Sequence, residues 1–422
     1  MIDKIAIKGA VAALVAVVIG SPAGADSLTL KQAIETALKS NPSIAAQQLS
    51  ADAAGQAARG ARALKNPEMI LAPSLVGTAG ADSAALISQP LELNGSRKAR
   101  AQVAGQEAAI AKADAQIISR NIILNVKQIY WGTAQAQHIV KLNEQNVSYL
   151  ETLGEAVRRQ VDVGRIPGSQ IIKTDVELSR AKQELAQAAL DYETSKASLN
   201  TLLNRPPRAD VTLVDELAFV SFKPDADKMI SDGLANRPEI GSASAELGAA
   251  QGRIDAARAE LRPDAAVEAR KESFDSRDSG IAVSFNLPIF DWGSRKAAVK
   301  QAQTLAASQQ QQMEATRNAI KLDVEQALLA ERTTAELVEY YQGGILDKSE
   351  QLATLAQKGF EKGATSYLEV LEAQRTLRTI RSDYISAIAA HSKAVAQLEW
   401  AANVEMTPDA APQKASAIEV KR

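Results

Sequence analysis

The segment Gly95-Ser96-Arg97-Lys98-Ala99 recurs letter for letter as Gly293-Ser294-Arg295-Lys296-Ala297, at an offset of 198 in a chain of 422 residues. Two further pairs keep almost the same spacing: Asn41-Pro42 with Arg237-Pro238 at 196, and Gly164 with Gly363 at 199. An ordered series of matches at a nearly constant offset indicates that the chain contains a duplicated unit of domain size.

Each half contains the same order of predicted elements. A helical pattern comes first and ends at an X-Pro pair, because the residue before a proline disfavours the α region. Two extended segments follow, and Ile281, Val283 and Phe285 alternate there with small or polar residues, which is the period of a strand. The predicted bounds are 30–64 and 227–261 for the helices, and 68–76, 84–93, 265–272 and 279–290 for the strands.

A long proline-free helical pattern follows the strands in each half, at 97–161 and 295–361, with Ser96 and Ser294 as the expected N-caps. About 65 residues at 1.5 Å each make a helix of about 100 Å. A helix of this length needs neighbours along its whole length. A glycine-containing turn then leads into a return helix that ends near 203 or 402. The first helix and the return helix, stacked end to end, would line the long one.

The chain is predicted to divide into five segments. Lys4 and Lys8 precede a short apolar run, and Ala23-Gly24-Ala25 offers a cleavage site, which together indicate a removed signal peptide. The last residues contain two prolines, several alanines and charges, so we expect a disordered tail. The segments are the signal peptide 1–25, the first repeat 26–204, a connector 205–226, the second repeat 227–405 and the tail 406–422.

The composition argues against several classes of site. The chain has no cysteine and only two histidines, His138 and His391, so neither a disulfide framework nor a Cys or His metal site is expected. A net charge of −2 gives no reason to expect nucleic acid binding. We find no nucleophile elbow, phosphate loop or metal-ligand cluster, and therefore expect no enzymatic activity and no cofactor.

Four predicted strands per chain restrict how the protein can meet a membrane. The smallest single-chain barrels have about eight strands, and an open sheet would leave unpaired edges in lipid. Two alternatives follow: a small sheet in water, as part of a soluble periplasmic coiled-coil protein, or a barrel closed by symmetric association. Strand lengths near the membrane requirement and the signal peptide favour association, and leave the number of subunits open.

Three segments carry a resemblance to a known family. They are the two strand-to-helix junctions, Gln89–Arg97 and Leu287–Gly293, and the second hairpin turn, Gly359–Gly363 followed by Tyr367–Gln374. Together with the duplicated order of elements, these segments resemble the TolC family of outer-membrane efflux channels over essentially the whole mature chain. Gln89–Arg97 is most similar to the heavy-metal branch, which serves cobalt–zinc–cadmium-type pumps.

The resemblance implies a mainly α fold with a small β part, in which a long α-helical barrel and a membrane β-barrel are both closed by trimerisation. The homotrimer would lie in outer-membrane lipid with a long periplasmic extension. A periplasmic adaptor (a membrane fusion protein) would connect it to an inner-membrane RND transporter. Substrate, with heavy-metal cations as one candidate, would then pass passively to the exterior. A type I secretion duct or a multidrug efflux duct of the same fold is the alternative.

The resemblance also assigns site residues on the second hairpin. Glu369 and Glu372 match the positions where family members place a ring of acidic residues at the periplasmic constriction, and at i and i+3 they share a helix face. A solvated acidic helix face is the alternative interpretation. The first hairpin has Gln170 and Lys173 at the equivalent positions, so no second acidic ring is expected.

Two glycines mark the hairpin turns. Gly164 and Gly363 match the turns where adaptor hairpins are expected to pack, and a glycine after a helix C-terminus also tolerates a positive φ. Some family members latch the closed turn with a Tyr and an Arg. Phe360 and Thr365 stand at those positions, so that latch is not expected.

Overall fold

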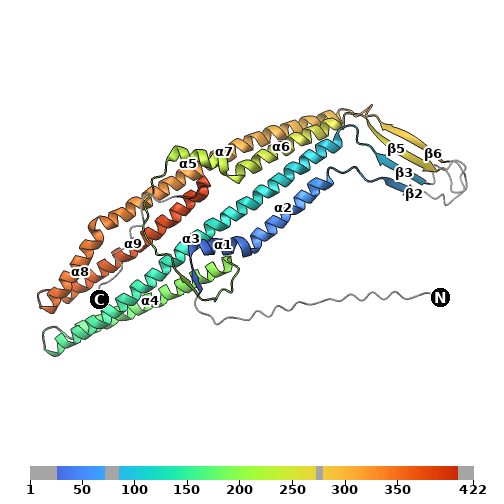
Figure 1. The fold of residues 1–422 in the computed structure, drawn as a ribbon. Coiled ribbons are helices and arrows are strands. Elements are labelled where there is room, and N and C mark those ends of the chain that lie inside the picture. The colour runs from blue at the N-terminus through green and yellow to red at the C-terminus, as the bar shows by residue number, and fades with distance from the viewer. Residues whose placement is uncertain (1–25, 72–84, 272–278, 407–422) are drawn as a thin grey trace, which may run out of the picture.

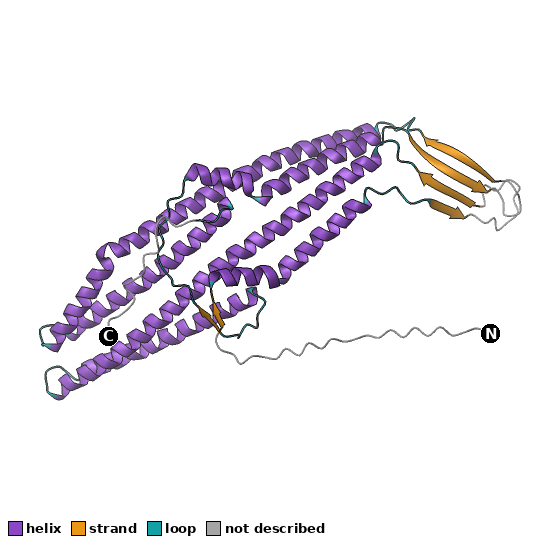
Figure 2. Ribbon diagram, viewed as in Figure 1, coloured by secondary structure: helices purple, strands orange, loops and turns teal. Residues whose placement is uncertain are grey.

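The computed structural model describes residues 26–71, 85–271 and 279–406. The predicted signal peptide, the turns predicted between the strands of each half, and the predicted tail from 407 onward lie outside these residues. Figure 1 shows an elongated molecule with a sheet at one end and two helical hairpin turns at the other. Helices make up most of it (Figure 2). None of the described helices is both long and apolar enough to cross a membrane.

The elements follow nearly the same order in the two halves. The first half consists of β1 (Asp26–Leu28), α1 (Leu30–Ser40), α2 (Pro42–Gly60), β2 (Glu68–Leu71), β3 (Ala85–Pro90), α3 (Ser96–Asp162) and α4 (Ser169–Leu202). The connector contributes β4 (Val211–Leu213), which pairs in parallel with β1. The second half consists of α5 (Ala226–Asn236), α6 (Pro238–Ala259), β5 (Asp264–Lys271), β6 (Ser279–Asn286), α7 (Ser294–Tyr340), a π-helical turn η1 (Tyr341–Ile345), α8 (Leu346–Glu361) and α9 (Tyr367–Ala402).

The helix predicted before the strands is two helices in each half, so the prediction of one continuous helix was wrong. The break falls at Asn41-Pro42 between α1 and α2, and at Arg237-Pro238 between α5 and α6. A proline has no N–H to donate to the preceding turn and is tolerated at the first position of a new helix. Asn41 supports the break because its Oδ1 accepts a hydrogen bond from Ser43 N at 2.9 Å.

The long helix of the first half is confirmed, whereas that of the second half is interrupted. α3 runs unbroken over 67 residues. In the second half, α7 gives way to the π-helical turn η1, within which Gly344 has a φ of 115°. A φ of 115° is not helical, so η1 is a kink at which α7 and α8 meet. The second column is therefore α7, η1 and α8 instead of one uniform helix.

The N-caps of the long helices are not the serines that we expected. Gly95 and Gly293 occupy the cap positions, with φ values of 94° and 88°. The residues before them supply the side-chain acceptors. Asn94 Oδ1 accepts a hydrogen bond from Ser96 N at 3.0 Å, and Asp291 accepts backbone N–H donors in the same way.

Short helices line the long ones through a joint that occurs in both halves. In the first half α2 and α4 both pack on α3, and Asn41 Nδ2 donates to Leu202 O at 2.9 Å where their ends meet. In the second half Asn403 Nδ2 donates to Asn236 O at the same distance. The predicted end-to-end stacking is confirmed at these joints, since the return helix of each half is bonded to the break in the first helix.

The four strands form one antiparallel sheet in the order β2-β3-β5-β6, so the β3–β5 pair joins the two halves. β6 ends at Asn286, before Pro288, because a proline cannot donate to a strand ladder. The registers place alternate residues on the same face. One face carries exposed large apolar side chains: Met69, Leu71, Ile87, Val267, Ile281, Val283 and Phe285. The other face carries Glu68, Ser88, Glu268, Arg270 and Ser284, together with Ile70 and Leu86.

A buried ionic network holds four helices together midway along the molecule. Arg237, at the start of α6, has a side chain that is 4% exposed. It donates to Asp323 of α7 and to Glu239, both at 2.8 Å. Arg120 of α3 donates to the same Glu239 carboxylate at 2.9 Å. Both guanidinium groups lie over the ring of Trp400 in α9. The network therefore connects α3, α6, α7 and α9.

Replacing Arg237 should strongly destabilise the protein. The change Arg237→Ala leaves Asp323 without its cation and Glu239 with Arg120 alone. Breaking a buried ion pair in this way typically costs about 3 kcal/mol or more. The exposed pair Arg332–Glu336 offers a matched control, because Arg332 is 78% exposed and its loss should cost under about 0.5 kcal/mol. Thermal unfolding in detergent measures both variants. Equal shifts of the two melting temperatures would contradict this assignment.

The same network predicts how stability depends on pH. Burial alone would raise the pKa of Glu239, but the hydrogen bonds from Arg237 and the charge of Arg120 hold it below its ordinary value. A carboxylate with a lowered pKa stabilises the folded state above its unfolded pKa, and this contribution is lost as the pH falls through the folded value. The difference in melting temperature between wild type and Glu239→Gln should thus be constant near neutral pH and shrink only in acid.

Candidate functional site: the two hairpin ends

Both hairpins turn through the same backbone motif. Gly164 and Gly363 have φ values of 73° and 77°, in the left-handed region that favours glycine. In the first turn, Arg165 N donates to Gln160 O at 2.9 Å and Gly164 N donates to Val161 O. The second turn has the equivalent pair of bonds, so both are Schellman motifs. A Cβ added to either glycine would meet no atom within 4 Å, which makes both turns open surface.

The second turn leads into α9 through a reciprocal cap. Ser366 Oγ accepts a hydrogen bond from Glu369 N at 3.3 Å, and the Glu369 carboxylate accepts one from Ser366 N at 3.0 Å. This capping box satisfies two N–H groups that the first turn of a helix would leave unpaired. Glu369 therefore has a structural role in addition to any role for its charge.

Glu372 is the less constrained of the two predicted glutamates. Its side chain is exposed, and it forms no ion pair or hydrogen bond with any described residue. Glu369 and Glu372 both lie on the exposed side of α9, one turn apart. On the first hairpin, Lys173 is exposed whereas Gln170 is half-buried.

The two hairpins are bonded to each other just behind the turns. The hydroxyl groups of Thr174 in α4 and Tyr367 in α9 are hydrogen-bonded at 2.8 Å and buried. Arg375 of α9 forms an ion pair with Glu177 of α4. A second pair, between Arg378 and Glu184, lies further along the same two helices. Arg375 is therefore bound across the hairpins and is not paired with the nearby Glu372.

Phe360 and Thr365, which stand where some family members have the Tyr–Arg latch, make packing contacts instead. Phe360 is buried and its ring lies 6.4 Å from that of Tyr367. A Cβ added to Gly359 would lie 2.0 Å from Thr365 Oγ1, so only glycine fits at 359. These residues make the second turn compact through van der Waals contact.

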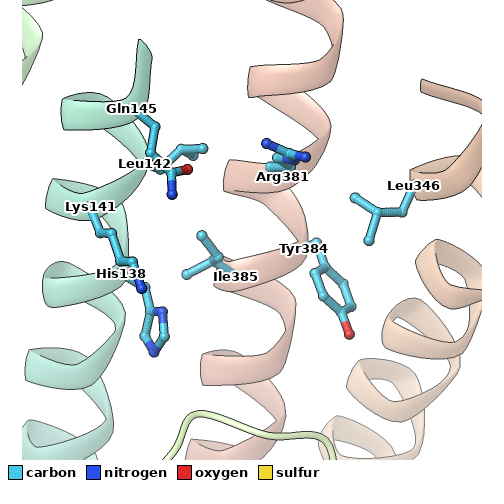
Figure 3. A pocket seen from close by; sticks show the side chains of 8 residues that line it. All are labelled: His138, Lys141, Leu142, Gln145, Leu346, Arg381, Tyr384 and Ile385. Atoms are coloured by element: carbon cyan, nitrogen blue, oxygen red, sulfur yellow. The ribbon is translucent and has the colours of Figure 1, made fainter. Parts of the chain in front are cut away.

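The histidines lie away from the turns. Figure 3 shows a small cavity with His138, Lys141, Leu142 and Gln145 on α3 facing Arg381, Tyr384 and Ile385 on α9, with Leu346 on α8. Burial lowers the pKa of His138, as does the charge of Lys141. His391 is buried, with its Nε2 2.9 Å from Val220 O of the connector. Within the described ranges, no group of three or more His, Asp or Glu side chains could hold a metal ion.

Comparison with known proteins fits this geometry. The profile of the outer membrane efflux protein family matches residues 33–205 and 229–404, which is most of the chain. The chain belongs to the outer membrane efflux protein family. Each of the two matched segments covers one of the halves that the sequence repeat delimits.

Relatives agree with this assignment. The chain is 27% identical over 370 residues to the cobalt-zinc-cadmium resistance protein CzcC of Cupriavidus metallidurans, covering 86% of this chain and 87% of that protein. Among solved structures, the outer-membrane channel OprN has a TM-score of 0.78 at 18% identity, covering 89% of this chain and 90% of OprN. The open-state channel MtrE of Neisseria gonorrhoeae has a TM-score of 0.74 at 23% identity, covering 89% of each chain.

Membership in this family places the protein among outer membrane efflux channels, a class that is not enzymatic. The predicted resemblance to TolC-type channels is confirmed, including the closeness to a cobalt–zinc–cadmium protein. The capping box at Ser366 was missed, although the pattern Ser-x-x-Glu before an apolar run signals it. The bonds between the hairpins had no local signal, because their partners lie almost 200 residues apart.

Removing the cap should loosen the start of α9. Ser366→Ala deletes the acceptor for Glu369 N, which typically costs about 1 kcal/mol. Hydrogen exchange at the amides of 367–370 should therefore accelerate about fivefold, the factor that corresponds to this energy. Ser179→Ala, at an exposed position within α4, is the control and should change nothing at α9. Unchanged exchange in Ser366→Ala would mean that the cap does not stabilise the turn.

Proposed function

We propose that three copies of this chain close a twelve-stranded barrel in the outer membrane and a tunnel of helices that extends into the periplasm. The hairpin ends would form the periplasmic opening of this exit duct. A periplasmic adaptor would pack over the turns at Gly164 and Gly363, and an inner-membrane RND transporter would deliver the substrate.

The division of the sheet into two faces is the observation that carries this proposal. Ile281 is 82% exposed, Phe285 65% and Met69 62%, all on one face. Isolated monomers rarely leave such a continuous apolar patch in water. On the opposite face, Ser284 Oγ donates to Glu268 at 2.7 Å and Glu268 pairs with Arg270. An apolar outer face and a polar inner face are typical of strands in membrane barrels.

The open edges of the sheet favour association over the soluble alternative. β2 and β6 each pair on one side only. An unpaired edge is not tolerated in lipid, and edge-to-edge pairing of copies around a symmetry axis removes it. The resemblance to TolC-type channels implies three as the number of copies. In a soluble coiled-coil protein the apolar face of the sheet would remain exposed to water, which is unfavourable.

The substrate class is taken from a relative that matches most of this chain. CzcC is named for cobalt, zinc and cadmium, and we propose heavy-metal cations as the substrate of this duct. The duct would conduct them passively. Cations need only weak carboxylate contacts to be attracted, and Glu369 and Glu372 of three chains would supply six carboxylates at the opening. A multidrug or type I secretion duct remains the alternative, with the same fold and a different pump.

A pair of neighbouring substitutions tests the orientation of the sheet. Val283→Lys places a charge on the apolar face, which costs about 2–4 kcal/mol in the middle of a bilayer. Ala282→Lys places the same charge on the other face, opposite Glu268. The first variant should fail to assemble in the outer membrane and the second should assemble. The measurement is the detergent-corrected mass of the extracted particle, expected at three chains. A monomer that purifies without detergent would overturn the proposal.

Neutralising the two glutamates tests the opening. The unmodified channel should prefer cations and be blocked from the periplasmic side by multivalent cations, because a ring of carboxylates raises the local cation concentration. Glu369→Gln with Glu372→Gln should lower the cation-to-anion permeability ratio toward one and weaken the block. Gln at 369 can still accept the bond from Ser366 N, so the capping box is kept. Single-channel recording in planar bilayers measures both properties.

A control double variant distinguishes the effect of an acidic ring at the opening from the effect of the protein's overall charge. Glu325→Gln with Glu339→Gln removes two exposed, unpaired carboxylates from α7, away from the turns. Exposed charges are screened within about 10 Å at 0.1 M salt, so this variant should keep the wild-type selectivity. Equal effects of the two double variants, or no effect of either, would remove Glu369 and Glu372 from the opening.

A further inference from the structure

A basic and aromatic collar lies across the molecule where the helices meet the sheet. We define the collar as the four connections between helices and strands, residues 61–67, 91–98, 260–263 and 287–296 (Figure 1). It contains seven Lys and Arg residues and three acids, in a chain whose total charge is −2. Positive charge is thus concentrated at this one level.

Two of the three acidic residues of the collar form hydrogen bonds or ion pairs with neighbouring residues. Glu92 is buried and pairs with Arg100 at 2.5 Å. Asp291 accepts hydrogen bonds from the backbone N–H groups of Gly293 and Arg295, at 3.0 and 3.1 Å. Only Glu260 remains exposed. By contrast, the exposed cations of the collar form no ion pair with any described residue: Arg62, Lys65, Arg97, Lys98, Arg262 and Lys296.

Exposed apolar side chains lie beside these cations. Ile289 is 73% exposed, Phe290 84% and Trp292 98%. Leu287 and Ile289 follow directly after β6 and are also exposed, so exposed apolar side chains continue from the sheet into the collar. Exposed tryptophan side chains are typical of the boundary between hydrocarbon and headgroups.

The backbone at Trp292 is also unusual. Its φ of 52° lies in the left-handed region, which residues with large side chains rarely adopt. Strained conformations of this kind persist where the surroundings or a function require them. Here the conformation belongs to a turn in which Ser294 N donates to Asp291 O at 2.9 Å, and this turn holds the side chain outward.

We propose that the collar binds anionic phospholipids, with the phosphate groups at Arg97, Lys98 and Lys296 and the acyl chains against Phe290 and Trp292. The proposal rests on the proposed membrane insertion and adds the class of lipid and the residues that recognise it. Charge complementarity selects an anionic headgroup over a zwitterionic one, and continuity with the apolar sheet face places acyl chains beside it. The bound lipids would fix the depth of the barrel and the angle at which the helices leave the membrane.

The experiment compares lipids retained by the assembled protein. The full chain is reconstituted in bilayers of phosphatidylethanolamine with one fifth phosphatidylglycerol, extracted gently, and its bound lipids are counted by native mass spectrometry. Wild type should retain phosphatidylglycerol well above its share of the bilayer. Each Lys or Arg near a membrane surface typically favours anionic lipid several-fold. The triple variant Arg97→Gln, Lys98→Gln, Lys296→Gln should therefore lower the enrichment about tenfold or more.

The matched control removes the same charge from the other end of the molecule. Arg165→Gln, Lys173→Gln and Lys358→Gln change three exposed cations near the hairpin turns. This variant should keep the wild-type enrichment. Shallow brominated phosphatidylglycerol should also quench the fluorescence of Trp292 more than brominated phosphatidylethanolamine does, with Trp292→Phe identifying its share of the signal.

The outcomes distinguish this proposal from the proposed function. If the protein inserts and conducts but retains the two lipids in their bilayer ratio, or if the collar variant and the control behave alike, the collar proposal is wrong and the channel assignment stands. If the protein does not insert into bilayers at all, the proposed function fails first. Enrichment that depends on the collar cations, together with quenching of Trp292, supports the proposal.

Discussion

The structure depends on supporting one very long helix along its whole length. α3 has 67 residues and extends about 100 Å, and an isolated helix gains too little from its own hydrogen bonds to stay straight in water. No single partner covers it. α2, α4, α6 and α9 each pack on a different stretch or side. The short first helices, the half-length return helices and the duplication itself all follow from this need, because two shorter helices must meet end to end beside each long one.

The joints where shorter helices meet show how duplicated positions diverge. Asn41 and Arg237 occupy equivalent places before a proline, and both are buried. Asn41 caps the next helix and bonds to Leu202 O. Arg237 makes no capping bond and instead joins Asp323 and Glu239. A buried helix end must satisfy its polar groups, and the two halves meet this requirement with a neutral cap in one and an ionic network in the other.

The sequence predicted the elements that have a period and missed those that depend on distant partners. The alternation in 279–290, the long proline-free runs and the turn glycines were sufficient to locate the strands, α3 and both hairpins. The breaks at Pro42 and Pro238 were missed because the apolar pattern continues through them. The ion pairs that join the hairpins could not be predicted, since the sequence does not show which of many carboxylates the fold brings close to a given surface Arg. The proposed closure of the sheet would require other copies of the chain, which the sequence of one copy does not place.

The segment η1 explains a small irregularity in the sequence repeat, namely a change of one residue in the offset between the halves. The offset between the halves grows from 198 at the start of the long helices to 199 at the turns, so the second column contains one extra residue. In a uniform α-helix one inserted residue would rotate everything after it by about 100°. The buried positions of the second column instead follow a seven-residue spacing on both sides and a single eight-residue step across η1: Val324, Glu331, Val338, Leu346, Ala353 and Phe360. η1 thus absorbs the insertion, α8 keeps its apolar side against α9, and the turn at Gly363 stays equivalent to the turn at Gly164.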